Sequence, residues 1–160
     1  MATADPQDTS LAVAGSEVRL RWSPDVGETW VVASEPDWGR LEGIRLVSAA
    51  FEDGAVLGVA AIRPRNANGH GDDVLAARFV DAEGNQTDTS DALVSVEYDA
   101  ARRPRRLGIE LWPDSDLPPL RIAADREPTE ELREEREMVP MALRLDGVGG
   151  RGTYETLRPG

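Results

Sequence analysis

The amino-acid sequence predicts an all-β protein, namely an antiparallel β-barrel of about eight to ten strands with at most one short helix. Apolar and polar residues alternate in several segments, of which Val18–Trp22 and Leu107–Leu111 are examples. Successive side chains of a strand point to opposite faces, so this alternation gives each strand one dry face and one wet face. Turn residues separate the apolar segments, and together these two patterns favour a barrel or flattened barrel.

The predicted strands and turns follow one another along the whole chain. Ile44–Phe51 and Ala55–Ile62 form a hairpin around Glu52–Gly54, where Gly54 readily takes the positive φ that tight hairpin loops require. The later strands are expected at Val74–Val80, Val94–Tyr98, Leu107–Leu111, Leu120–Ile122 and Met141–Leu145, with turns at Asp81–Asn85, Asp99–Arg106 and Pro113–Asp116.

Three segments depart from the alternating pattern. The hairpin Ile44–Ile62 is apolar on both faces, so we expect it to be buried on both sides, or covered by a helix, a neighbouring domain or a second subunit. Thr129–Glu137 has good helix formers behind a plausible N-cap and is expected to be a short surface helix or a mobile loop. Residues 1–9 read as a disordered tail, which leaves residues 10–160 as a single barrel domain.

Composition excludes several classes of function. The net charge of −12 would repel a phosphate backbone, so we expect no nucleic-acid partner. The chain lacks a run of the roughly eighteen apolar residues that a membrane helix needs, and it lacks a secretory leader, so we expect no membrane partner and a cytoplasmic location. It has no cysteine and one histidine, so we expect no metal and no cofactor. All 18 basic residues are arginine, which excludes lysine Schiff-base chemistry.

The stretch Asn66–Asp73 holds the single histidine of the chain. His70 lies between two glycines and is followed by Asp72, and an imidazole beside a carboxylate can act as an acid or a base near neutral pH. The alternative is a polar loop in which His70 caps a strand end or faces solvent.

Four tryptophans are candidates for ligand contacts. Trp22, Trp30 and Trp38 lie close together in the sequence, and Trp112 ends a predicted strand. An indole ring offers a large flat face and one N–H donor, which suits the binding of an apolar ligand or a cation. The alternative is that these rings fill the barrel core and its end. Tyr98 is expected to line the same cavity.

A glycine-rich turn, Asp146–Gly152, leads into the last predicted strand. Glycines at such a place let the backbone approach another element closely. Tyr154 and Glu155 follow and must face opposite sides of the strand, although the sequence does not reveal which one points inward. Tyr154 is a candidate ligand contact, and Glu155 is a candidate general acid.

Several short segments occur together in an order that resembles a known family. They are Trp38-Gly39, Phe51–Gly54, His70–Asp72, the Val94–Arg106 hairpin and Asp146–Glu155. Residues 35–157 thereby resemble the C-terminal lipocalin-like (calycin) domain of the carotenoid 1,2-hydratase and AttH-like group. The resemblance implies a lipocalin-like barrel and hydratase or pericyclase chemistry on terpenoid or polyketide substrates. Such proteins carry two barrels and this chain has room for one, so homodimerisation could rebuild an interface between barrels.

Three functions remain open at this point. The first is binding of a small apolar molecule (terpenoid, steroid or polyketide-like) inside the barrel, with or without its cyclisation, hydration or isomerisation. The second is a non-catalytic interaction domain that uses the apolar hairpin 44–62 as its partner surface. The third is a hydrolase with paired carboxylates, although the acidic residues are scattered over wet strand faces and turns, where carboxylates usually lie.

Overall fold

The computed structural model describes residues 8–23, 29–67, 72–113, 118–127 and 137–158. In these ranges the chain forms twelve antiparallel strands and no α-helix, so the predicted all-β class is confirmed. No helix that could cross a membrane occurs in the described part of the chain. The predicted helix Thr129–Glu137 lies almost wholly outside the described residues, and only Glu137 is seen, as the first residue of a strand.

The first three strands form a small sheet of their own. They are β1 (Asp8–Val13), β2 (Ser16–Trp22) and β3 (Trp30–Val32), paired in the order β1-β2-β3. Asp8 and Thr9 pair with Arg21 and Leu20, so β1 begins inside the segment that the sequence marked as a tail.

The other nine strands form one large sheet. It has the order β7-β6-β5-β4-β12-β11-β10-β9-β8, so the last strand of the chain lies at its centre. The number of strands agrees with the predicted eight to ten. The bounds are β4 (Leu41–Phe51), β5 (Val56–Pro64), β6 (Val74–Val80), β7 (Gln86–Thr89), β8 (Ala92–Tyr98), β9 (Pro104–Leu111), β10 (Leu120–Arg126), β11 (Glu137–Leu145) and β12 (Val148–Leu157).

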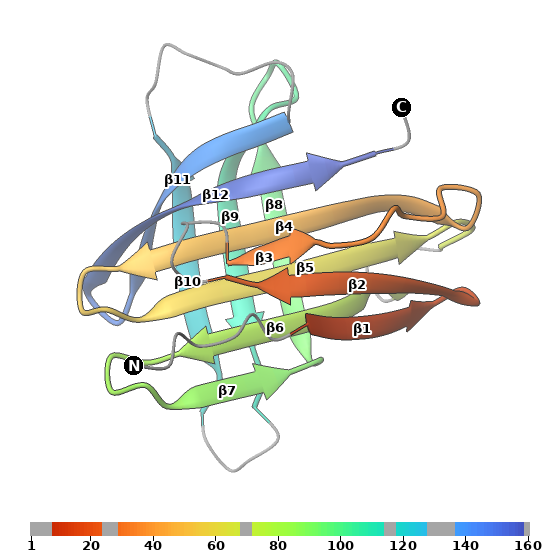
Figure 1. Cartoon of the computed structure of the whole chain (residues 1–160). Coiled ribbons are helices and arrows are strands. Elements are labelled where there is room, and N and C mark those ends of the chain that lie inside the picture. The colour runs from red at the N-terminus through yellow and green to blue at the C-terminus, as the bar shows by residue number, and fades with distance from the viewer. Residues whose placement is uncertain (1–7, 24–28, 68–71, 114–117, 128–136, 159–160) are drawn as a thin grey trace.

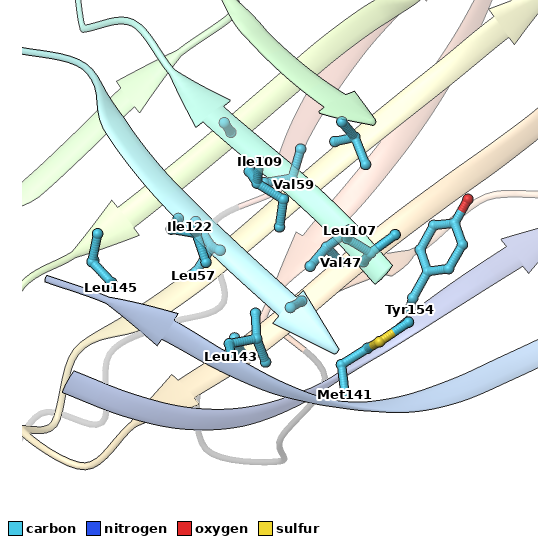
Figure 2. Packing of buried hydrophobic residues seen from close by; sticks show 14 of the residues in the cluster. Val47, Leu57, Val59, Leu107, Ile109, Ile122, Met141, Leu143, Leu145 and Tyr154 are labelled. Carbon is cyan, nitrogen blue, oxygen red and sulfur yellow. The ribbon is translucent and has the colours of Figure 1, made fainter. Parts of the chain in front are cut away.

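The large sheet curls into a half-barrel. Strands β8 to β10 cross behind β4 to β7 at a steep angle, while the small sheet lies in front of β4 and β5 (Figure 1). The concave face between the two crossing layers holds the main hydrophobic core. Figure 2 shows its side chains meeting from both layers, with Tyr154 at one end of the cluster and Leu145 at the other. The interior is therefore filled with side chains over most of its length.

The hairpin β4–β5 is buried on both faces, as the sequence predicted. Val47 and Val59 point into the concave core, whereas Ile44 and Ile62 point the other way into a second core beneath the small sheet. All four side chains are fully buried. Strands β1 to β3 of the same chain cover the hairpin, so its burial requires neither a second subunit nor another domain. The hairpin is therefore not a free partner surface, which removes the basis for the interaction domain that the sequence allowed.

Glycines of β12 allow it to pass unusually close to β4. A Cβ atom on Gly152 would lie 1.8 Å from the carbonyl oxygen of Ser48, and one on Gly150 would lie 2.7 Å from the ring of Phe51. Neither position has space for a side chain, which confirms the close approach predicted from the glycine-rich segment. These contacts fix the seam at which the two halves of the sheet meet.

Candidate functional site

The concave face changes its character along the strands. One end is apolar: Phe51 of β4 packs edge-to-face on Phe79 of β6, with ring centroids 6.5 Å apart. At the other end the inward positions carry charge, because Arg45 lies one inward step beyond Val47 and Arg63 lies two steps beyond Val59. We call this second end the open end.

A cavity of about 320 Å³ lies at the open end. It lies between strands β4, β5, β8 and β12, and Tyr154 of β12 marks the point where the packed core begins. The lining residues are Glu42, Gly43, Ile44, Arg45, Ala61, Arg63, Tyr98, Tyr154, Thr156 and Arg158.

Asp73 holds two of the arginines in place. Its carboxylate accepts a hydrogen bond from Nη2 of Arg45 at 3.0 Å and from Nε of Arg63 at 2.9 Å. The Asp73 side chain is only 2% exposed, whereas both arginines remain partly exposed. A buried carboxylate is stable only with such charge-assisted hydrogen bonds. Asp73 therefore acts as a fixed anchor behind two guanidiniums that line the cavity.

The same arrangement favours the charged form of Arg63. The hydrogen bond to Asp73 raises the pKa of Arg63 above its already high ordinary value. Three guanidiniums (Arg45, Arg63 and Arg158) meet two carboxylates (Glu42 and Asp73) in and directly behind the cavity wall. Among the residues that line the cavity, arginines thus outnumber carboxylates, on a chain whose net charge is −12. The open end is a positive site on an acidic protein.

Tyr154 supplies a neutral polar group at the base of the cavity. Its side chain is buried, and this burial raises the pKa of its phenol, while hydrogen bonds with Arg45 and Thr156 act in the opposite direction. The hydroxyl therefore stays protonated at physiological pH and offers a hydrogen-bond donor where the apolar core meets the charged rim.

Two of the predicted ligand contacts lie in this cavity. Tyr98 and Tyr154 both line it, with Tyr98 at the rim, 53% exposed, and Tyr154 at the base. Among the described residues, no group of three or more histidine, cysteine, aspartate or glutamate side chains lies close enough together to hold a metal ion.

Trp22 and Trp30 lie elsewhere, on the convex side of β5. Their rings pack edge-to-face with centroids 4.9 Å apart, beneath the small sheet. The guanidinium of Arg78 lies 5.1 Å from the ring centroid of Trp22 and 4.8 Å from that of Trp30, and it is paired with Asp88 at 2.8 Å. Both rings therefore fill a core, which was the alternative interpretation, and a wall of the half-barrel separates them from the cavity.

The two remaining tryptophans are also distant from the cavity. Trp38 is half-buried at the edge of the core beneath the small sheet, where its carbonyl accepts a hydrogen bond from Nε of Arg65 at 2.7 Å. Trp112 follows the end of β9 that pairs with Ala92, whereas Tyr98 lies at the opposite end of β8. Trp112 is held there by backbone bonds with Asp91 and by the hydroxyl of Thr89.

Glu155 and Asp72, the two predicted acid–base residues that the structure describes, do not line the cavity. Glu155 is half-exposed and points to the convex face, because its neighbour Tyr154 occupies the inward position of β12. Asp72 is exposed and lies directly before the buried Asp73. His70 lies outside the described residues. Glu155 and the cavity thus lie on opposite sides of β12.

The residues that sequence analysis missed are Arg45, Arg63 and Asp73. The sequence did contain a signal for the two arginines. Each lies an even number of residues from inward-pointing apolar residues of its own strand, so it points to the same face. Asp73 was not singled out, because the sequence alone gave no reason to choose it over the neighbouring Asp72.

Comparisons with known proteins support the fold. No protein-family model and no curated protein matches the chain. Among solved structures the chain is similar to a Nitrosomonas europaea protein described as "putative AttH", with a TM-score of 0.56 and 14% sequence identity. The match covers 94% of this chain and 48% of the other, so the chain spans about half the length of that structure. At this identity the likeness concerns the fold alone, and it agrees coarsely with a lipocalin-like architecture.

Proposed function

We propose that the chain binds a small organic acid, an anionic group on a compact apolar body, in the cavity at the open end of the half-barrel. The observation that carries this proposal is the pair of partly exposed arginines, Arg45 and Arg63, anchored on a buried aspartate beside a 320 Å³ cavity. A barrel-like sheet that binds its ligand at the mouth is a common arrangement.

The anionic group follows from the charge of the cavity wall. Guanidinium groups bind carboxylates through short, charge-assisted and often paired hydrogen bonds. Because Asp73 already fixes two of the three arginines, little side-chain freedom is lost when a ligand binds, which favours affinity. The excess of arginines over carboxylates in the cavity lining also attracts anions that the rest of this acidic surface repels.

The compact apolar body follows from the cavity size and from Tyr154. A volume of about 320 Å³ is at the lower end of the range for small-molecule sites. The concave face beyond Tyr154 is filled by the core, so room exists at the mouth rather than along the barrel axis. This supports a refinement of the sequence-based expectation: the apolar molecule is short, it carries an acid, and it lies against Tyr98 and Tyr154.

Catalysis by this site stays a prediction from the sequence. Tyr154 is the group best placed for it, because a protonated phenol at the base of the cavity could donate a hydrogen bond or a proton to a bound molecule. Product analysis by mass spectrometry after incubation with each bound acid would test whether hydration, cyclisation or isomerisation takes place.

The binding experiment compares acids with their neutral amides. Calorimetry and thermal unfolding are measured with a panel of aromatic and terpenoid carboxylic acids, each beside its primary amide. We expect at least one acid to bind and to stabilise the fold, by about 2.7 kcal/mol when its concentration is 100 times Kd. The matching amide should bind at least about tenfold more weakly, since it lacks the charge.

Two arginine variants locate the site. Arg63→Met should weaken acid binding by about tenfold or more, because it removes one charge-assisted contact. Arg121→Met is the matched control, since Arg121 is a solvent-exposed arginine on the outer face of β10 and should leave the affinity unchanged. Equal binding of acids and amides, or equal effects of the two variants, would contradict the proposal.

A further inference from the structure

One broad face of the half-barrel is left uncovered. The convex side of β4 and β5 lies beneath the small sheet, whereas the outer sides of β8, β9 and β10 have no such cover among the described residues (Figure 1). Ser95, Gly108 and Ala123 are exposed at the middle of these three strands. Leu93 of β8, 39% exposed, lies on the same face.

This face is hollowed along a line that crosses the strands. Ser95 pairs with Gly108, and Gly108 pairs with Ala123, so three small side chains form one row across the sheet. Larger side chains flank the row on both sides, which leaves a shallow groove of about 580 Å³. We call this hollow the outer groove.

Charged side chains of both signs border the outer groove. On one side Arg121 faces Glu110 at 4.0 Å, and on the other Arg106 pairs with Asp125 at 2.9 Å. The groove itself is lined by three arginines and three carboxylates, so its formal charge is zero. These residues are Arg106, Arg121, Arg144, Glu97, Glu110 and Asp146.

The lining of the outer groove is electrically balanced, whereas the chain as a whole is acidic. The chain carries a net charge of −12, so two copies repel each other over most relative orientations. The outer groove is a face on which this repulsion is absent, and alternating charges of both signs can meet their opposites across a two-fold axis. Such self-complementarity is what an isologous dimer interface requires.

We propose that the outer groove binds the same groove of a second copy, which forms a two-fold symmetric dimer by packing of sheet on sheet. The row of small residues lets the two sheets approach closely, and Leu93 adds apolar area. This proposal does not depend on the ligand at the open end.

Analytical ultracentrifugation with the full chain tests the proposal. We expect the wild type to sediment as a dimer at roughly tens of micromolar and to dissociate on dilution. Gly108→Arg should raise the dimer dissociation constant by at least about tenfold, since it places two like charges in the interface. The site tolerates a side chain, because the nearest atom to a Cβ there is the Cβ of Ser95 at 4.0 Å.

Two further variants make the result decisive. Ala82→Arg adds the same charge in the exposed turn between β6 and β7 and should leave the dimer intact. Ala123→Arg, on the neighbouring strand, should repeat the effect of Gly108→Arg. If circular dichroism shows that one of the two groove variants is poorly folded, the other still tests the interface. A wild type that stays monomeric at all concentrations, or a dimer that survives both groove variants, would overturn the proposal. Acid binding at the open end should be the same in all variants, so this test stands apart from the one above.

Discussion

The two ends of the concave face are built from the same strands but contain opposite kinds of side chain. At one end Phe51 and Phe79 pack on each other within the apolar core. At the open end Arg45 of β4 and Asp73, directly before β6, form an ion pair in which the carboxylate is buried and the guanidinium is partly exposed. Both ends keep the strand alternation, so the difference lies in which residues occupy the inward positions.

The contrast suggests a division of roles, in which the apolar end stabilises the fold and the charged open end serves the proposed binding function. Apolar side chains at inward positions stabilise the fold at no desolvation cost, whereas a buried ion pair is often no better than the apolar residues that could replace it. A half-barrel that needed only stability could carry leucine at positions 45 and 63. The charged inward positions are what the proposed binding of an organic acid requires, and three substitutions test this division.

The largest effect is expected at the packed end. Leu57 is fully buried in the concave core, so Leu57→Ala should lower the free energy of unfolding by about 3 kcal/mol through lost burial and a residual cavity. Urea denaturation measures this, and acid binding should persist in the fraction that remains folded. A loss below about 1 kcal/mol would mean that the interior is loosely packed, and the division into a packed end and an open end would fail.

A smaller loss is expected from Asp73→Asn at the open end. The substitution leaves two arginines without their shared carboxylate, but both are partly exposed and solvent screens them, so we expect about 2 kcal/mol. Acid affinity should also change, because the guanidiniums are no longer held in one orientation. Asp91→Asn is the matched control: Asp91 is exposed just before β8, only its backbone takes part in the hydrogen bonds described here, and its replacement should leave both stability and binding close to wild type. Equal effects of the two variants would remove Asp73 from its anchoring role.

The smallest effect at neutral pH is expected from Tyr154→Phe. It removes a hydroxyl that hydrogen-bonds with Arg45 and Thr156, at a cost of about 1 kcal/mol. Burial raises the pKa of this phenol above its ordinary value of 10.0, so the folded state favours the protonated form. The wild type therefore keeps this stability below about pH 10 and loses it as the pH rises further through the folded pKa.

Urea midpoints measured from about pH 9 to about pH 11 make this visible. The stability difference between wild type and Tyr154→Phe should shrink over this range, because the variant has no phenol to ionise at this position. A constant difference at all pH values would show that Tyr154 is not held in its neutral form at the junction of core and rim.

The strands could be predicted from the sequence because alternation is a local property. The hairpin around Glu52–Gly54 and the strands at Val94–Tyr98 and Leu107–Leu111 were predicted close to their observed positions. The two-sided burial of the hairpin was also predicted, but its cover was not, because β1 and β3 are short strands that become recognisable only when they pair with β2.

The candidate site was harder to predict because it depends on sheet order. Arg45 and Asp73 are 28 positions apart, and they meet because β4 and β6 both flank β5. The contact between these two residues cannot be predicted from a local sequence pattern. The tryptophans illustrate the opposite error. Trp22 and Trp30 attract attention as aromatic residues, but they belong to the small sheet, and their rings fill the core between that sheet and β5.

The central place of β12 has a consequence for how the chain reaches its folded state. The hairpins of residues 41–89 and those of residues 92–145 adjoin each other in the sheet only through β12. During synthesis on the ribosome, the edge strands β4 and β11 of the two partial sheets therefore stay unpaired until residues 148–157 have been made. Such long-range closure makes folding slow and exposes unpaired edges to aggregation, so this protein should depend on chaperones during its synthesis.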